Sequence, residues 1–236
     1  MIDIHCHLLY GVDDGAESLA EASKMMKIAY KAGVTDIIVT PHCNVPDSYG
    51  NYWNNEMDER FSSLCSLAKE YEIPINLHKG QEIFCTKRVP VLLQSGSLIP
   101  LASSKYILTE FGFNESPIFV FERTEELLKL GYKVIIAHPE RYDFVIEDTE
   151  AAEILKNMGA LLQINKGSIL GSFGHKIKDT ANALLRMKLA DIVASDAHSA
   201  ARRTTDLLPA YEYVCEYYSK EYADKLITEN PMKITE

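Results

Sequence analysis

The feature that most constrains the fold is a regular alternation of short apolar runs with longer amphipathic segments. Residues 36–40, Asp-Ile-Ile-Val-Thr, form a β-branched run of the kind found in buried parallel strands. Before it, residues 17–31 carry apolar side chains at helical spacing, with Ser18 able to cap the start and Gly33 just past the end. Together with an extended strand that opens the chain, these segments predict a β-α-β unit.

The same alternation continues along the chain. Further strands are expected at residues 75–83, 105–111, 133–137, 161–165 and 191–195, and further helices at residues 52–71, 115–130, 149–158, 175–187, 206–218 and 219–228. Seven strands joined by helices predict parallel pairing through right-handed crossovers and a closed or nearly closed barrel, with an open doubly wound sheet as the alternative. Because 47% of the 236 residues are hydrophobic, the chain can bury a large core, and we expect one domain spanning residues 1–236.

Composition excludes several classes of partner. The formal net charge is −10 and there is no basic tract, which argues against binding to nucleic acid or to anionic membranes. No apolar run approaches the roughly 18 residues of a spanning helix, and the chain opens on a strand rather than a basic and apolar leader, so we expect a cytoplasmic protein without membrane insertion. The five cysteines are spread without a Cys-x-x-Cys pair, which argues against a disulfide framework or a zinc knuckle. The oligomeric state is left open.

Histidines and carboxylates recur at the ends of the expected strands. His5 and His7 lie two residues apart on the opening strand and therefore project from the same face. Asp14 belongs to an Asp-Asp-Gly turn that can reach back over the strand end. In a barrel of parallel strands the carboxyl ends surround one mouth, where active sites of this architecture lie. The candidate metal ligands are His5, His7, Asp14, His42, Glu82, Glu110, His138, Asp196 and His198.

This set of imidazoles and carboxylates suits first-row metal ions and requires no thiolate. Nine ligands suit more than one ion, and three ions are conceivable. Glu82 or Asp196 could bridge neighbouring ions, an arrangement in which water held between them becomes an in-line nucleophile. Manganese, iron, zinc and cobalt are all compatible with these ligand types. We expect His78 and His175 to be packed or capping residues outside the site.

Arginines follow two of the candidate ligands closely. Arg141 lies three residues beyond His138, and Arg202 and Arg203 lie just beyond His198. A guanidinium group binds phosphate oxygens in a bidentate manner. We expect Arg141 and Arg203 to bind phosphate, with Arg202 the less favoured of the adjacent pair. A metal cluster combined with arginines favours hydrolysis of a phosphoester.

These residues form motifs that resemble those of the polymerase and histidinol phosphatase (PHP) superfamily, whose hallmark is an opening His-x-His and a closing Asp-x-His. More narrowly, the chain resembles the CpsB/CapC-type bacterial tyrosine phosphatases from end to end. The motifs that carry this resemblance are Met1-Ile-Asp-Ile-His-x-His, Val12-Asp-Asp-Gly, Thr40-Pro-His, Gly80-x-Glu, Glu110-Phe, Ala137-His-Pro-Glu-Arg-Tyr and Ala194-Ser-Asp-Ala-His. The resemblance implies a distorted (β/α)7 barrel of the TIM-like PHP type, with its metal site at the C-terminal ends of the strands.

The resemblance also implies a manganese-dependent protein-tyrosine phosphatase with two or three ions per chain. Its partner would be an autophosphorylated bacterial tyrosine kinase with a tyrosine-rich C-terminal tail, and its role would be control of capsule and exopolysaccharide synthesis. Asp14 would act in catalysis beside Arg141 and Arg203. The implied ligand sets are His5, His7, Glu82 and Asp196 for one ion, Glu82, Glu110 and His138 for a second, and Asp14, His42 and His198 for a third.

Two other functions remain open at this point. The same cluster could hydrolyse a small-molecule ester, as in a histidinol-phosphate phosphatase of the same superfamily. The chain could also be a non-catalytic metal-binding or regulatory module, although an intact ligand set argues against a degenerate module. The sequence leaves both the native metal and the general acid unassigned.

Overall fold

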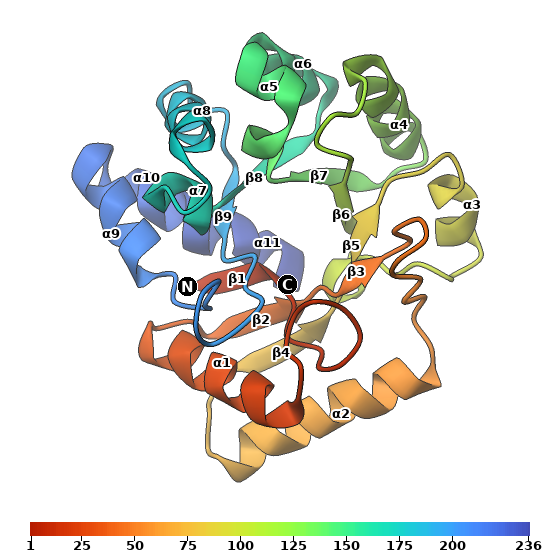
Figure 1. The fold of residues 1–236 in the computed structure, drawn as a ribbon, viewed down its shortest axis with the longest axis vertical. Coiled ribbons are helices and arrows are strands. Elements are labelled where there is room, and N and C mark those ends of the chain that lie inside the picture. The colour runs from red at the N-terminus through yellow and green to blue at the C-terminus, as the bar shows by residue number, and fades with distance from the viewer.

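The computed structural model describes residues 1–236 and has parallel strands at its centre, with helices arranged around them (Figure 1). All strand pairs are parallel. The expected α/β alternation is therefore confirmed. The strands are β1 (Ile2–Cys6), β2 (Asp36–Val39), β3 (His42–Cys43), β4 (Asn76–Lys79), β5 (Glu82–Phe84), β6 (Tyr106–Glu110), β7 (Lys133–Ala137), β8 (Leu161–Asn165) and β9 (Ile192–Ala194).

The hydrogen-bonded strands form two sheets rather than one continuous ladder. One sheet has the order β1-β2-β4 and the other has the order β3-β5-β6-β7-β8-β9. Backbone hydrogen bonds connect the two sheets just beyond β9. There the His7 amide donates to the Ala197 carbonyl and the Asp196 amide donates to the His5 carbonyl, both at 2.9 Å. The observed fold is thus a parallel α/β fold whose ladder is interrupted.

The helices enclose the strands, as Figure 1 shows for most of them. Ser18 caps the first helix as expected, because its hydroxyl accepts from the Glu21 amide at 3.2 Å. None of the helices combines the length and apolar character needed to cross a bilayer. The helices and short helical turns are α1 (Leu19–Lys31), α2 (Asn55–Glu70), α3 (Val89–Gln94), η1 (Leu101–Ser103), α4 (Pro117–Lys129), η2 (Pro139–Arg141), α5 (Asp143–Glu147), α6 (Glu150–Met158), α7 (Lys166–Leu170), α8 (His175–Arg186), α9 (Leu208–Tyr217), α10 (Lys220–Asp224), η3 (Lys225–Glu229) and α11 (Asn230–Thr235).

The prediction of a single strand at residues 75–83 is wrong, because the chain breaks there into β4 and β5. A Cβ atom at Gly80 would lie 2.7 Å from Leu101 Cδ2 and 2.8 Å from Ile38 Cγ2, so the backbone approaches η1 and β2 too closely for a regular strand with side chains. The buried Gln81 side chain then pairs with loop backbone instead of a strand neighbour. This break separates the two sheets.

Several short helices were not expected from the sequence. These are α3, α5, α7 and α11, of which α11 follows the point where the last helix was expected to end. Pro231 lies in the first turn of α11, where its missing N–H group leaves no hydrogen bond unmade. Each of these helices has five or six residues, too few to display a clear apolar period.

We predict that Gly80→Ala lowers the free energy of unfolding by about 1–3 kcal/mol, because the added methyl group overlaps packed side chains of Leu101 and Ile38. Gly50→Ala is the matched control, since the nearest atom to its new Cβ would be 3.9 Å away. Urea unfolding of both variants measures the difference. Equal stabilities would show that position 80 has room for a side chain.

Candidate metal centre

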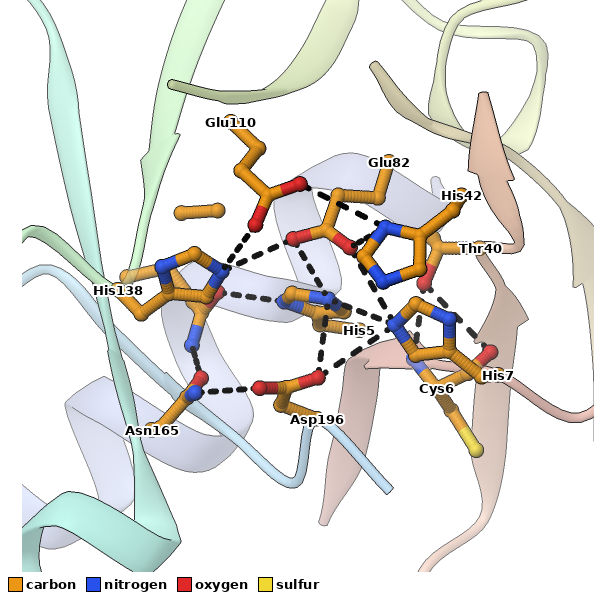
Figure 2. A network of polar contacts seen from close by, with 12 residues as sticks. His5, Cys6, His7, Thr40, His42, Glu82, Glu110, His138, Asn165 and Asp196 are labelled. Atoms are coloured by element: carbon orange, nitrogen blue, oxygen red, sulfur yellow. Dashed lines mark hydrogen bonds and ion pairs between the residues drawn. The ribbon is translucent and has the colours of Figure 1, made fainter. Parts of the chain in front are cut away.

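The structure brings all nine candidate ligands together, but His42 and Glu82 are the first residues of β3 and β5 and do not end a strand as expected. His5, His42, Glu82 and Glu110 belong to strands β1, β3, β5 and β6, and the others lie in the segments that follow β1, β7 and β9. Figure 2 shows the imidazole and carboxylate groups of the central seven pointing toward one another. These seven are His5, His7, His42, Glu82, Glu110, His138 and Asp196.

Glu82 lies at the centre of the cluster and is completely buried. Its Oε1 atom is 3.0 Å from His138 Nε2 and 3.2 Å from His5 Nε2. Its Oε2 atom is 2.8 Å from His42 Nδ1 and 3.3 Å from His7 Nε2. One carboxylate therefore faces four imidazoles, which come from three parts of the chain.

The two imidazoles of β1 and its extension face each other directly. The Nε2 atoms of His5 and His7 are 3.2 Å apart, and each is 3.4 Å from Asp196 Oδ1. His7 Nδ1 is 2.8 Å from Asp13 Oδ2, and since a carboxylate oxygen accepts, this nitrogen carries the hydrogen. The Nε2 atom of His7 is thus the ring nitrogen that points into the cluster.

A chain of amides imposes the same tautomer on His5. Because the Asp196 carboxylate only accepts, Asn165 Nδ2 donates to its Oδ2 at 2.5 Å. The Asn165 oxygen then accepts from Gln163 Nε2 at 2.8 Å, which turns Gln163 Oε1 toward His5 Nδ1, also at 2.8 Å. His5 Nδ1 must therefore donate. The Nε2 atoms of both imidazoles consequently face each other and the carboxylates of Glu82 and Asp196, an arrangement that a shared cation would stabilise.

Two further groups of ligand atoms are close enough to hold an ion. Asp14 Oδ1 is 3.4 Å from His198 Nε2 and 3.5 Å from His42 Nε2. Glu110 Oε2 is 3.5 Å from His42 Nδ1 and its Oε1 is 3.5 Å from His138 Nε2. With the His5 and His7 pair described above, there are three groups whose ligand atoms lie within 4.8 Å of one another. They are His7, Asp14, His42 and His198; His5, His7 and Asp196; and His42, Glu82 and Glu110.

Buried atoms without hydrogen bonds also fit metal binding. His42 Nδ1 and Glu82 Oε2 are only 2.8 Å apart, yet neither is oriented to form a hydrogen bond, and His198 Nε2 also lacks one. Buried polar atoms of this kind are rare in folded proteins. The donor set of imidazole nitrogens and carboxylate oxygens therefore fits first-row metal ions, and each ion would satisfy these atoms.

The crowding of acidic groups shifts their protonation. Burial, with the neighbouring Glu82 carboxylate, raises the pKa of Glu110 to about 8. Burial also favours the neutral form of Glu82, but the His5 and His42 imidazoles outweigh it and hold its pKa well below the usual range. Burial lowers the pKa of His138 to about 4, so this imidazole is neutral near pH 7 and available as a ligand.

Three outer residues of the site were not expected from the sequence. Asp13 accepts from the His42 and Gly15 amides at 2.9 Å in addition to holding His7, so the neighbour of the expected Asp14 orients the turn. Gln163 and Asn165 belong to β8, which corresponds to the one strand among the seven expected from the sequence that carried no candidate ligand. Their spacing of two on a strand end was the available signal.

Two ligands lie on strained backbone. His138 has φ 36° and Asp196 has φ 49°, values in the left-handed region that non-glycine residues seldom adopt. These bends turn the chain inward directly after β7 and close to the end of β9. Strained backbone of this kind clusters at functional sites.

The arginines after β7 and β9 both contact the same carboxylate. Arg203 forms an ion pair through Nη2 with Asp196 Oδ2, and its Nε donates to the Asp196 carbonyl at 3.1 Å. Arg141 Nη1 is 3.7 Å from Asp196 Oδ2. Arg202 is exposed and forms no ion pair, although it lines a pocket with Asp14 and His198, so only Arg141 and Arg203 contact a carboxylate of the ligand cluster.

Other titratable groups lie outside this site. His78 Nε2 is 3.0 Å from Asp36 Oδ1, and His175 is exposed at the start of α8. All five cysteines are free, and burial raises the pKa of Cys43 and Cys85 to about 12. Neither of these two thiols supplies a reactive thiolate near neutral pH.

Comparison with known proteins identifies the family. A family model described as "Capsular polysaccharide synthesis, CpsB/CapC" matches residues 1–236. The tyrosine-protein phosphatase YwqE of Bacillus subtilis (strain 168) is 36% identical over 235 residues, covering 98% of this chain and 89% of that protein. The tyrosine-protein phosphatase CpsB of Streptococcus pneumoniae is 31% identical over 241 residues, covering 99% and 98%. The chain belongs to the CpsB/CapC family.

A solved structure gives the same result. It is described as crystal structures of YwqE from Bacillus subtilis and CpsB from Streptococcus pneumoniae, unique metal-dependent tyrosine phosphatases. The TM-score is 0.92 at 33% sequence identity, and the match covers 100% of this chain and 94% of that chain. The fold around the ligand cluster is therefore shared with proteins described as metal-dependent.

The raised pKa of Glu110 predicts a pH-dependent effect in metal-free protein. Between its ordinary value of 4.5 and about 8, the folded state retains a proton that the unfolded chain releases, so stability falls as the pH rises through this window. We expect chelator-treated Glu110→Gln to melt at a higher temperature than wild type at pH 8, and the difference to shrink towards pH 4.5. Thermal melts followed by circular dichroism measure this.

Glu59→Gln is the control for this measurement, because Glu59 is an exposed residue of α2 without an ion pair. Its melting temperature is expected to follow the wild-type pH profile. A Glu110→Gln variant that melts below wild type at pH 8 would mean that the ionised carboxylate stabilises the metal-free cluster.

Proposed function

We propose that this chain is a metal-dependent protein-tyrosine phosphatase. The observation that carries the proposal is the pair of imidazoles, His5 and His7, whose Nδ1 atoms are both engaged and whose Nε2 atoms face each other at 3.2 Å beside Asp196. Two arginines on the same carboxylate add a site for phosphate. The names of the CpsB and YwqE relatives support phosphotyrosine as the substrate.

In this proposal two or three ions bind, with Mn²⁺ as the first choice and iron, zinc or cobalt as alternatives. The ligand sets are His5, His7, Glu82 and Asp196 for one ion, Glu82, Glu110 and His138 for a second, and Asp14, His42 and His198 for a third. The distances among these atoms support each set. When bound, such ions activate water and withdraw charge from phosphate oxygens.

The residues of the chain have separate tasks in the reaction. Arg141 and Arg203 bind the phosphate oxygens and stabilise the negative charge that grows on them in the transition state. His198, whose Nε2 is 3.4 Å from Asp14 Oδ1, holds the pKa of the Asp14 carboxyl well below its usual range. Asp14 therefore stays ionised and is able to accept a hydrogen bond from an attacking water molecule, which orients that water for attack.

The leaving group needs little help when it is a phenol. A phenol has a pKa near 10, far below that of an alkyl alcohol, so cations around the phosphate suffice where no dedicated acid is available. This favours phosphotyrosine over phosphoserine. The proposed partner is the phosphorylated, tyrosine-rich C-terminal tail of a bacterial tyrosine kinase, and the capsular polysaccharide description of the family supports a role in capsule and exopolysaccharide synthesis. A cytoplasmic location follows from that partner.

For the architecture, we infer one domain over residues 1–236 in which the two sheets act together as a distorted (β/α)7 barrel. The hydrogen bonds between the segments after β1 and β9 support closure. A buried apolar cluster that draws side chains from strands of both sheets supports it as well, as expected for a barrel interior. Its strand members include Ile4, Ile38, Leu108, Ile135 and Ala194.

The decisive experiment compares substrates. We expect a tyrosine-phosphorylated kinase-tail peptide to be hydrolysed with a kcat/KM at least about tenfold above that of the phosphoserine peptide of the same sequence, because phenolate leaves more easily. Histidinol phosphate is expected to be a poor substrate. A chelator should abolish turnover, and iodoacetamide should not, because no thiol takes part. A higher kcat/KM for histidinol phosphate than for the phosphotyrosine peptide would instead support a small-molecule phosphatase.

A second prediction concerns Arg141. We expect Arg141→Ala to lower kcat/KM for the phosphotyrosine peptide by a hundredfold or more, about 2.7–4 kcal/mol, because a contact made in the transition state is lost. Metal content, measured by atomic emission, should stay near the wild-type value. Arg186→Ala, which removes an exposed arginine at the end of α8, is the matched control with near wild-type turnover. Normal turnover in Arg141→Ala would make this arginine a surface residue.

A further inference from the structure

One aromatic ring at the edge of the ligand cluster has no role so far. Phe113 follows β6 and is the only phenylalanine of the chain with an exposed side chain, at 40%. Exposing a phenyl ring forgoes the stabilisation that its burial would give. Its place beside Arg141, which is proposed to bind phosphate, suggests a use for the exposed surface.

The position of the ring is well defined by its neighbours. The guanidinium carbon of Arg141 lies 4.3 Å from the centre of the Phe113 ring. The His138 ring is 5.9 Å away and nearly perpendicular, at 68°. Phe113 thus borders both an arginine proposed to bind phosphate and a proposed metal ligand.

The backbone holds this arrangement from both sides. The Phe113 carbonyl accepts from the Asp143 amide at 2.8 Å, which ties the loop after β6 to the start of α5. The hydroxyl of Tyr142 donates to the Ala137 carbonyl. The same hydroxyl accepts from the Phe111 amide at 3.1 Å. The loops that carry Phe113 and Arg141 are therefore joined, and the ring is positioned before substrate arrives.

In an in-line displacement the leaving oxygen departs on the side of phosphorus opposite the attacking water. Since the ligand cluster lies on the buried side of the mouth, the leaving group must point outward, past Arg141 and toward solvent. We propose that the exposed face or edge of Phe113 packs against the aryl ring of the substrate and thereby selects phosphotyrosine over alkyl phosphates. This inference rests on the proposed phosphatase activity.

Phe173 offers a contrast on the other side of Arg141. Its ring centre is 4.7 Å from the guanidinium carbon of Arg141 and 5.8 Å from that of Arg203. It is also packed on backbone, because a Cβ at Gly167 would lie 2.9 Å from Phe173 Cε2. Phe173 supports both arginines, so its loss should weaken the binding of every phosphoester alike.

The test measures kcat/KM for a phosphotyrosine peptide and for the phosphoserine peptide of identical sequence, and the inhibition constant of inorganic phosphate. We expect Phe113→Ala to lower the phosphotyrosine value about tenfold, as for the loss of an aromatic pair and its buried surface, with the other two quantities little changed. Phe113→Leu, which keeps apolar bulk, should lie between Phe113→Ala and wild type. Phe173→Ala should lower kcat/KM for both peptides and raise the inhibition constant of inorganic phosphate.

Ile118→Ala, an exposed apolar residue at 67% on α4, is the surface control, and thermal melts confirm that each variant is folded. An equal loss on both peptides with weaker phosphate inhibition in Phe113→Ala would overturn the inference and make Phe113 a support for Arg141. Unchanged phosphotyrosine hydrolysis would overturn it too. A wild-type protein that hydrolyses neither peptide would instead refute the proposed phosphatase activity.

Discussion

The buried Glu82 carboxylate is the interaction on which the site depends. An isolated charge at a fully buried position would be strongly unfavourable, and here four imidazoles offset that cost. Glu82 lies on β5, in the larger sheet, whereas His5 lies on β1 in the smaller one, so the contact also joins the two sheets. The strand break at Gly80 lies just before Glu82, which is the first residue of β5.

Around this carboxylate, outer groups decide what the imidazoles can do. Asp13 and the Gln163–Asn165 pair each accept or relay a hydrogen bond that places the hydrogen of a histidine on Nδ1. The Nε2 atoms therefore point inward, and the same amide chain ends on Asp196. Left-handed backbone at Asp196 then turns the chain so that Arg203 reaches this carboxylate as well. The candidate ligands, their tautomers and the two arginines are in this way linked through one connected network. Figure 2 shows the part of this network around Glu82 and Asp196.

The long elements of the fold were predictable from the sequence, and the short ones were not. The strand at Leu161–Asn165 and the helix at Leu19–Lys31 were expected within two residues, because their apolar period extends over enough residues to be recognised. Helices of five or six residues, such as α3 and α7, depend on tertiary contacts more than on their own propensity. The strand break at Gly80 depends on Leu101, which is distant in sequence, and no local pattern reports it.

By itself the sequence determined which residue types occur at the ends of the strands, since period-two alternation and turn residues are local properties. It thereby placed the nine candidate ligands and two candidate arginines on one side of an α/β fold. Only the tertiary structure decided which atoms face one another: that Asp13 holds His7, that β8 supplies Gln163 and Asn165, and that Arg203 rather than Arg202 reaches Asp196. The physical reason is that hydrogen-bond direction, ion pairing and ring packing act over a few ångströms between segments up to 192 residues apart in the chain, where the Ser195 amide after β9 donates to Asp3 of β1.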